Sequence, residues 1–171
     1  MLQEKGVHFI GLVTPSHQSP YIRKAIKKAI LNGLKIPIIY NSSAYDSLEE
    51  LKKWEGLISI YLPDIKYSND ELAFKYSKVK DYVNVSREAI TEMYRQVSDI
   101  NIDYGNNGNN GNHGDNGCGI ATKGLWVRHL VLPNNQAGTW ESLCFLAFEI
   151  SLDIGLSIMS QYGPLFNAKK Y

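Results

Sequence analysis

The sequence predicts an α/β fold built around a parallel sheet, and three observations support this assignment. Short apolar segments alternate with segments of helical periodicity, in the order β-α-β-α-β-α-α-β-α-β. Such alternation favours parallel strands joined by right-handed crossovers. The predicted strands are apolar along nearly their whole length, which is typical of strands covered on both faces.

The predicted strands cover residues 7–13, 36–40, 57–62, 125–132 and 156–160. Helices are expected at residues 19–33, 46–51, 72–76, 85–97 and 139–150. The expected helix caps are Ser19, Asp46, Ser68 and Thr139. Pro20 follows Ser19 in the first turn of its helix. Asp46 with Glu49, and Ser68 with Glu71, form capping boxes. This order of elements sets which loops lie at the carboxyl edge of the sheet.

Size and charge narrow the class of protein. The 171 residues suffice for one domain with a hydrophobic core, and we expect residues 1–171 to form a single domain. A formal net charge of +1 favours neither nucleic acid nor an anionic membrane as a partner. No apolar run approaches the ~20 residues that span a bilayer, and no signal peptide is evident. We therefore expect a cytoplasmic protein.

Residues 104–120 are expected to form a disordered surface insertion, because a tract of glycine and asparagine buries little apolar area. A metal role for His113, Asp115 and Cys118 within it is a weaker alternative. Cys118 and Cys144 are the only cysteines, and two isolated thiols form no zinc or cluster motif. Cys144 lies in an apolar run and is expected to be a buried, unreactive thiol.

Polar residues follow the predicted strands, and in α/β folds this edge of the sheet carries function. They are Thr14, Ser16 and His17; Asn41, Ser42 and Ser43; Asp64 and Lys66; Arg128; and Gln161. Each could serve only as a turn or surface residue. A charge such as Arg128 inside an apolar strand is costly, however, unless it is paired or lines a cavity. Together the set indicates a site for a polar ligand.

Five segments carry a family resemblance: VTPSH (13–17), PIIYNSS (37–43), IYLPDIKY (60–67), VRHLVLP (127–133) and MSQYGP (159–164). Together they resemble radical S-adenosylmethionine (radical SAM) proteins similar to the pyruvate formate-lyase activating enzyme. The resemblance implies a partial (β/α)6 barrel with parallel strands, which lacks its first β/α unit because the chain begins at the family's second strand. It also implies SAM and a [4Fe–4S] cluster as cofactors, which carry the radical chemistry.

The resemblance assigns roles to the polar residues at the strand ends. Residues 41–43 match a loop that helps bind SAM and a monovalent cation, and Asp64 with Lys66 matches an Asp-x-Lys pair near the same ligand. Arg128 matches an arginine that approaches SAM. Residues 14–17 stand where many members bind the SAM amino group, and Gln161 lies in a segment without the histidine of the true activating enzymes.

The CxxxCxxC motif that holds the cluster in this family is not in the sequence. We therefore expect a truncated or split radical SAM protein that is inactive alone and contains no catalytic residue or metal ligand. The expected small-molecule partner is SAM. The expected protein partner is a polypeptide with the missing N-terminal β/α unit or a glycyl-radical-type target protein. The missing unit would pair with the exposed edge of residues 7–13.

Two other hypotheses fit the same residues. The chain could be a non-catalytic module that binds SAM or a nucleoside. It could also belong to an unrelated α/β-barrel enzyme that uses Asp64 and Lys66 as acid and base. Neither a nucleophile constellation nor a phosphate-binding loop is found in the sequence.

Overall fold

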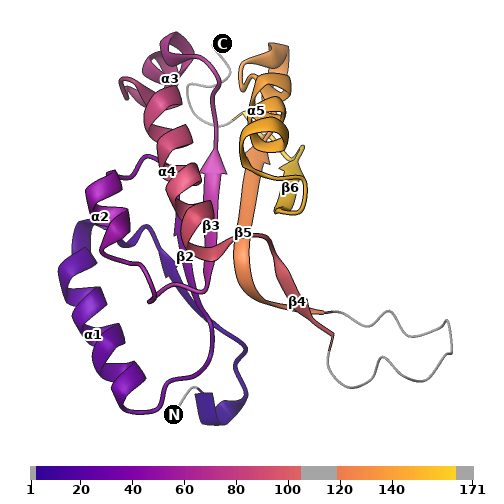
Figure 1. The fold of residues 1–171 in the computed structure, drawn as a ribbon. Helices are drawn as coiled ribbons and strands as arrows, with labels where there is room; N and C mark the ends of the chain where they lie inside the picture. The colour runs from indigo at the N-terminus through magenta and orange to yellow at the C-terminus, as the bar shows by residue number, and fades with distance from the viewer. Residues whose placement is uncertain (1–2, 105–118, 165–171) are drawn as a thin grey trace, which may run out of the picture.

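The computed structural model describes residues 3–104 and 119–164, which form a six-stranded sheet with helices packed on one face (Figure 1). The strands are β1 (Ile10–Val13), β2 (Ile38–Ser42), β3 (Ile60–Ile65), β4 (Asn101–Asp103), β5 (Ile120–Leu130) and β6 (Gly155–Met159). The α-helices are α1 (Ser19–Leu31), α2 (Leu48–Lys52), α3 (Asp70–Ser77), α4 (Tyr82–Val97) and α5 (Thr139–Phe145). A π-helix, Leu146–Ile150, extends α5.

The sheet is mostly parallel, which confirms the predicted α/β class. Its strand order is β1-β2-β3-β5-β4, and β6 also pairs with β5. Only β4 runs antiparallel to its neighbour among the described strands. Strands β4 and β6 pair with opposite ends of the long strand β5 (Figure 1). No pairing joins β1 to β6 within the described residues, so these strands do not close a barrel.

Near the glycine-rich tract, one predicted strand start is wrong and one strand was missed. Strand β5 begins at Ile120 rather than at residue 125, and β4 was not predicted at all. A three-residue strand is too short to show an apolar alternation, which explains the omission. Ile120 belongs to β5. Residues 105–118 of the expected insertion at 104–120 lie outside the described residues.

The expected caps are each displaced by one residue. The caps of α1, α2, α3 and α5 are Gln18, Ser47, Asn69 and Gly138. Of the expected caps, Asp46 instead accepts hydrogen bonds from Ser16 and Tyr40, and Thr139 bonds with His129. Tertiary contacts thus take up the side chains that local sequence would assign to the helix ends.

The hydrophobic core lies between the sheet and the helices. Alternate strand residues such as Tyr40, Tyr61 and Leu125 are fully buried against Trp54 and the inner side of α4. A smaller cluster, built on Tyr67, Ala73 and Tyr82, packs α3 against the end of the sheet. None of the described helices is long and apolar enough to cross a lipid bilayer.

The other set of alternating residues forms what we call the open face, because the described helices pack on the opposite side of the sheet. It bears Ile39 and Asn41 on β2, Leu62 and Asp64 on β3, and Trp126 and Arg128 on β5, all half-buried. The prediction that both faces of the sheet are covered is therefore wrong for the described residues. The outermost strand, β1, leaves Val13 73% exposed.

Gly124 forms a bend in β5, where the part paired with β4 meets the part within the parallel sheet. Its φ of 123° is rarely adopted by residues with a side chain. A Cβ atom at this position would collide with the backbone of Asp99 and Ile100. The Gly124 N–H also donates to the Ser59 carbonyl at 3.0 Å, so the bend is tied to the start of β3.

We predict that Gly124→Ala lowers the free energy of unfolding by about 2 kcal/mol or more, because it adds both backbone strain and a clash with backbone atoms. Urea denaturation followed by circular dichroism measures this change. Gly11→Ala is the matched control, since Gly11 has an ordinary φ and no atom within 4 Å of the added methyl. Equal stability of the two variants would contradict the role given to Gly124.

His129 is a fully buried polar residue of β5. Its Nδ1 donates to the Ile65 carbonyl at 2.9 Å, and its Nε2 lies 2.9 Å from the Thr139 hydroxyl. It therefore joins β5 to β3 and to the first turn of α5. Burial lowers the pKa of His129, and the hydrogen bond to Ile65 opposes that shift only in part.

We predict that the neutral form of His129 makes stability depend on pH. Above a pH of about 6.5 the imidazole is neutral in both the folded and unfolded states. Below that value only the unfolded chain gains a proton, until the pH reaches the lowered folded pKa. Stability should therefore fall in this window by at most about 1.4 kcal/mol per pH unit.

Urea unfolding at about pH 7 and about pH 5 tests this. The difference between the two pH values should be smaller in His129→Gln than in the wild type. A control variant, His17→Gln, changes an exposed histidine and should retain the wild-type difference. An unchanged pH dependence in His129→Gln would refute the prediction.

Candidate functional site

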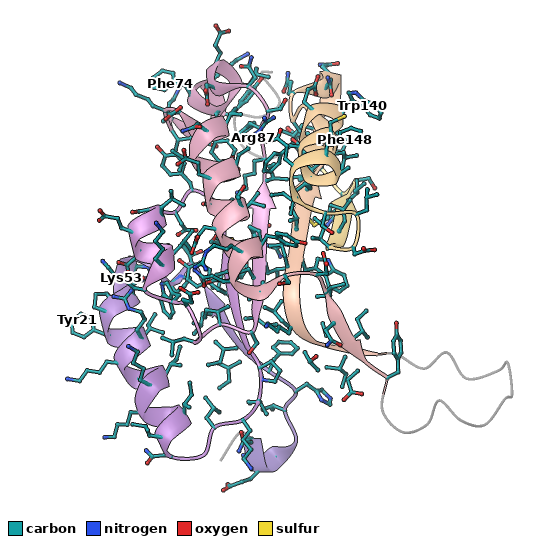
Figure 2. The ribbon with its side chains drawn as sticks, viewed as in Figure 1. Tyr21, Lys53, Phe74, Arg87, Trp140 and Phe148 are labelled. Atoms are coloured by element: carbon teal, nitrogen blue, oxygen red, sulfur yellow. The ribbon has the colours of Figure 1, made fainter. Side chains whose placement is uncertain are left out.

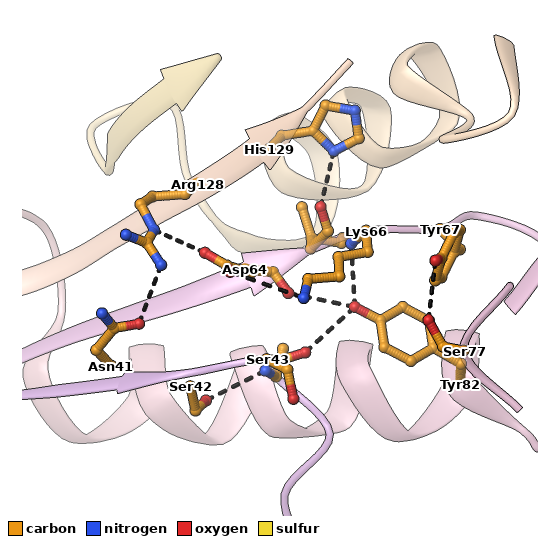
Figure 3. Close-up of polar contacts among 12 residues, drawn as sticks. Asn41, Ser42, Ser43, Asp64, Lys66, Tyr67, Ser77, Tyr82, Arg128 and His129 are labelled. Atoms are coloured by element: carbon orange, nitrogen blue, oxygen red, sulfur yellow. Dashed lines mark hydrogen bonds and ion pairs between the residues drawn. The ribbon is translucent and has the colours of Figure 1, made fainter. Parts of the chain in front are cut away.

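Three strands bring four polar side chains together at the carboxyl edge of the open face. Arg128 Nε donates to Asp64 Oδ1 at 2.6 Å, and Arg128 Nη2 donates to Asn41 Oδ1 at 3.1 Å. Lys66 Nζ lies 4.0 Å from Asp64 Oδ2. Figure 3 shows these contacts between β2, β3 and β5. We call Asn41, Asp64, Lys66 and Arg128 the polar cluster.

The strand register explains the polar cluster. Asp64 lies directly opposite Arg128 in the parallel pair of β3 and β5, so their side chains leave the sheet on the same face. Their side chains are 23% and 30% exposed, which leaves room for contact with a ligand. Arg128 is thus paired, as a charge within an apolar strand requires.

The polar cluster retains binding capacity. A guanidinium has five N–H donors, and the contacts with Asp64 and Asn41 use two of those of Arg128. The Lys66 side chain is 44% exposed and carries three ammonium donors. Such donors suit a carboxylate or a phosphate, whereas Asp64 can accept from an ammonium or a hydroxyl.

An apolar hollow of about 350 Å³ lies on the open face, on the amino-terminal side of the polar cluster, and no member of the cluster lines it. Its walls include Leu62 and Trp126, each two residues before a member of the cluster on the same strand. A Cβ at Gly155 would come within 2.6 Å of the Trp126 ring, so the indole lies over the backbone of β6. The open face therefore presents polar groups next to an aromatic, apolar surface.

The loop after β2 contributes backbone rather than side chains. Ser42 is buried, and its Oγ accepts from the Ala44 N–H at 3.1 Å, so it stabilises the turn. Ala44 has a φ of 59°, a left-handed conformation that glycine usually provides. The Ser43 carbonyl lies 3.3 Å from the Tyr82 hydroxyl. The Ser42 side chain therefore bonds within its own turn and not with the polar cluster. Ser43 contacts Tyr82 through its backbone carbonyl.

The loop after β1 forms a 3-10 helix, Pro15–Gln18, beside the end of β2. Thr14 donates its N–H to the Asn41 carbonyl at 2.8 Å, and its own carbonyl contacts His17 Nδ1 at 3.0 Å. Ser16 Oγ donates to Asp46 Oδ1 at 2.8 Å. These contacts fix the loop. The Thr14 bond reaches Asn41 only through its backbone carbonyl, and none of these contacts involves a side chain of the polar cluster. Gln161 is exposed beyond the end of β6.

Residues that were not predicted also shape the site. The periodicity of two along a strand places Trp126 on the same face as Arg128, so the sequence contained a signal for it. The sequence gives no comparable signal for Tyr82, because its hydroxyl meets backbone atoms of strands far away in the chain. Asp46 was interpreted as a helix cap, which hid its bonds to Ser16 and Tyr40.

The described side chains offer hydrogen-bonding partners for a polar ligand rather than thiolates for an iron–sulfur cluster. No group of three metal-ligating side chains is found among residues 3–104 and 119–164. Cys144 lies on α5 and is half-buried rather than fully buried as expected, and Cys118 lies outside the described residues. The residues present thus do not form a cluster site, whereas the polar cluster offers partners for charged and hydroxyl groups of a ligand.

The comparison with known proteins found a distant relative whose description names no function. No family model matches the sequence. A Methanocaldococcus jannaschii protein, described as "Uncharacterized protein MJ0674", is 26% identical over 168 residues. The match covers 98% of this chain and 40% of that relative, so the chain spans less than half the length of the protein it resembles.

Proposed function

We propose that this chain is part of a radical SAM protein similar to the pyruvate formate-lyase activating enzyme, and that its polar cluster binds SAM. The observation that carries the proposal is the convergence of Asn41, Asp64, Lys66 and Arg128 from the ends of neighbouring strands. SAM carries a carboxylate, an ammonium, ribose hydroxyls and an adenine ring. The cationic groups suit the carboxylate, and Asp64 suits the ammonium or a hydroxyl.

The proposed architecture is a partial (β/α)6 barrel whose open face is the interior. Two observations support this interpretation. Helices pack on one face of a mostly parallel sheet, and β1 pairs only with β2 among the described strands. An unpaired strand edge can accept a further strand. A polypeptide that carries the missing β/α unit is therefore the proposed partner, and a glycyl-radical-type protein is the proposed target.

In this proposal the chain itself binds and orients SAM. Its two cysteines cannot supply the three thiolates of the family's cluster motif, so the cluster must be held by another segment. That segment would hold the cluster, and the cluster would supply the electron for radical chemistry on SAM. Arg128 and Asp64 hold the ligand in place and exchange no proton in this scheme.

A second candidate is a module that binds SAM or a nucleoside without chemistry, and the low cysteine content favours it. The acid–base alternative is less favoured, because Asp64 already pairs with Arg128 at 2.6 Å.

We predict that the chain binds SAM in the absence of iron and that Arg128→Gln weakens binding at least about tenfold, which corresponds to about 1.4 kcal/mol. Isothermal titration calorimetry with SAM and with adenosine measures both effects. Binding of SAM but not adenosine would show recognition of the amino-acid part of the ligand. Equal affinities for the two would favour the nucleoside-binding module.

Arg87→Gln is the matched control. Arg87 is also paired with a carboxylate, that of Glu149 at 3.9 Å, and is 33% exposed. It lies on α4, on the helix-covered side (Figure 2). Its replacement should leave SAM affinity unchanged. No SAM binding by the wild-type chain, or equal loss in both variants, would refute the proposed role of the polar cluster.

We also predict that incubation of this chain with iron and sulfide under reducing conditions yields no stoichiometric iron–sulfur cluster, because three clustered thiolates are needed. Iron and sulfide analysis together with the visible absorption spectrum measures the outcome. The variant Cys144→Ser should behave as the wild type. A cluster assembled on the wild-type chain alone would contradict the requirement for a second segment.

A further inference from the structure

Tyr82 lies beneath the polar cluster, where the ends of β2 and β3 meet the start of α4. Its hydroxyl accepts a hydrogen bond from the Lys66 N–H at 3.0 Å. The same oxygen lies 3.2 Å from the Asp64 carbonyl and 3.3 Å from the Ser43 carbonyl, and it can donate to either. One side chain therefore contacts backbone atoms of both strand ends (Figure 3).

The ring that carries this hydroxyl is held firmly. Tyr45 stacks on it with ring centroids 6.0 Å apart, and Tyr67 meets it edge-on at 5.5 Å. Asp70 Oδ1 accepts from the Val83 N–H at 2.9 Å, which anchors the first turn of α4 to α3. Tyr82 is 2% exposed, so its position depends on packing rather than on solvent.

The chemistry of the hydroxyl suits this role. Burial raises the pKa of Tyr82 above its ordinary value, so the hydroxyl remains protonated and keeps its hydrogen for a carbonyl. A phenylalanine would leave the Lys66 N–H and one carbonyl without their partner in a nearly water-free place. Loss of these bonds would loosen the very residues whose side chains face the ligand.

We propose that Tyr82 is a positioning residue for the site: its hydroxyl fixes the ends of β2 and β3 against each other and thereby places Asp64 and Lys66. The expected effect on SAM affinity rests on the proposed function, whereas the role of the hydroxyl in fixing the strand ends does not. Tyr82 itself touches no ligand in this scheme and acts through the backbone of residues 64–66 and through Ser43.

The test compares Tyr82→Phe with Tyr67→Phe by amide hydrogen exchange and by the NMR signal of the Arg128 Nε–H. Tyr67 is a neighbouring buried tyrosine whose hydroxyl bonds Ser77 on α3, not a strand end. In Tyr82→Phe the Lys66 amide should exchange at least about tenfold faster than in the wild type, with no change at Leu125 in the core. The Arg128 signal should shift or broaden. Tyr67→Phe should leave both signals unchanged.

Two hydrogen-exchange results would overturn the inference. One is an unchanged Lys66 amide in Tyr82→Phe, and the other is an equal acceleration at Lys66 and Leu125, which would indicate general loss of stability. SAM titration of the same variants is a separate readout, in which Tyr82→Phe should bind at least about fivefold more weakly than Tyr67→Phe. Equal SAM affinity in the two variants would also overturn it. If the wild type binds no SAM, the proposed function fails, and the exchange data still decide the role of Tyr82.

Discussion

The ion pair between Arg128 and Asp64 is the interaction on which the arrangement of the open face depends. A guanidinium in the middle of a parallel sheet is costly unless a neighbouring strand supplies a carboxylate, and β3 does so at the position directly opposite. The pair also holds Asn41 through the second guanidinium bond, so three strands share one polar contact. Residues from β2, β3 and β5 thereby converge without any help from loop conformation.

Polar groups on the two faces of the sheet have different roles. On the helix-covered face, His129, Asp46 and Tyr82 bond to strand ends, loops and helix starts, and they are buried. These bonds fix the backbone. On the open face, Arg128 and Lys66 remain partly exposed and keep unused donors. Rigid support on one side and available donors on the other is the arrangement expected of a ligand site.

The described part of the sheet has one uncovered face. The chain spans 40% of the Methanocaldococcus jannaschii relative, and its own described strands leave the edge of β1 and the apolar hollow around Trp126 without a cover. Apolar surface of this kind is favourable to bury against further polypeptide. The uncovered face and the unpaired edge of β1 are the features on which the proposal of a second segment rests.

The sequence by itself determined the order of the helices and of the five parallel strands, and the strand ends at which polar residues gather, but not the short antiparallel strand β4. Alternation along a strand also means that Arg128 and His129, as neighbours, occupy opposite faces. Those features depend on local periodicity and on the handedness of crossovers, which short segments encode. The sequence did not predict that Ser16 donates to Asp46, because Asp46 belongs to another loop and becomes a partner only after folding. It also did not predict that Ser42 accepts from the Ala44 N–H two residues later.

Only the tertiary structure decided the register that sets Asp64 against Arg128, two residues 64 positions apart in the chain. Register depends on how the helices pack and on the bend at Gly124, and neither is visible in a single strand. The same holds for Tyr82, whose hydroxyl meets backbone atoms of two strand ends. A local pattern reports which face a side chain occupies, whereas its partners are set by contacts between segments distant in sequence.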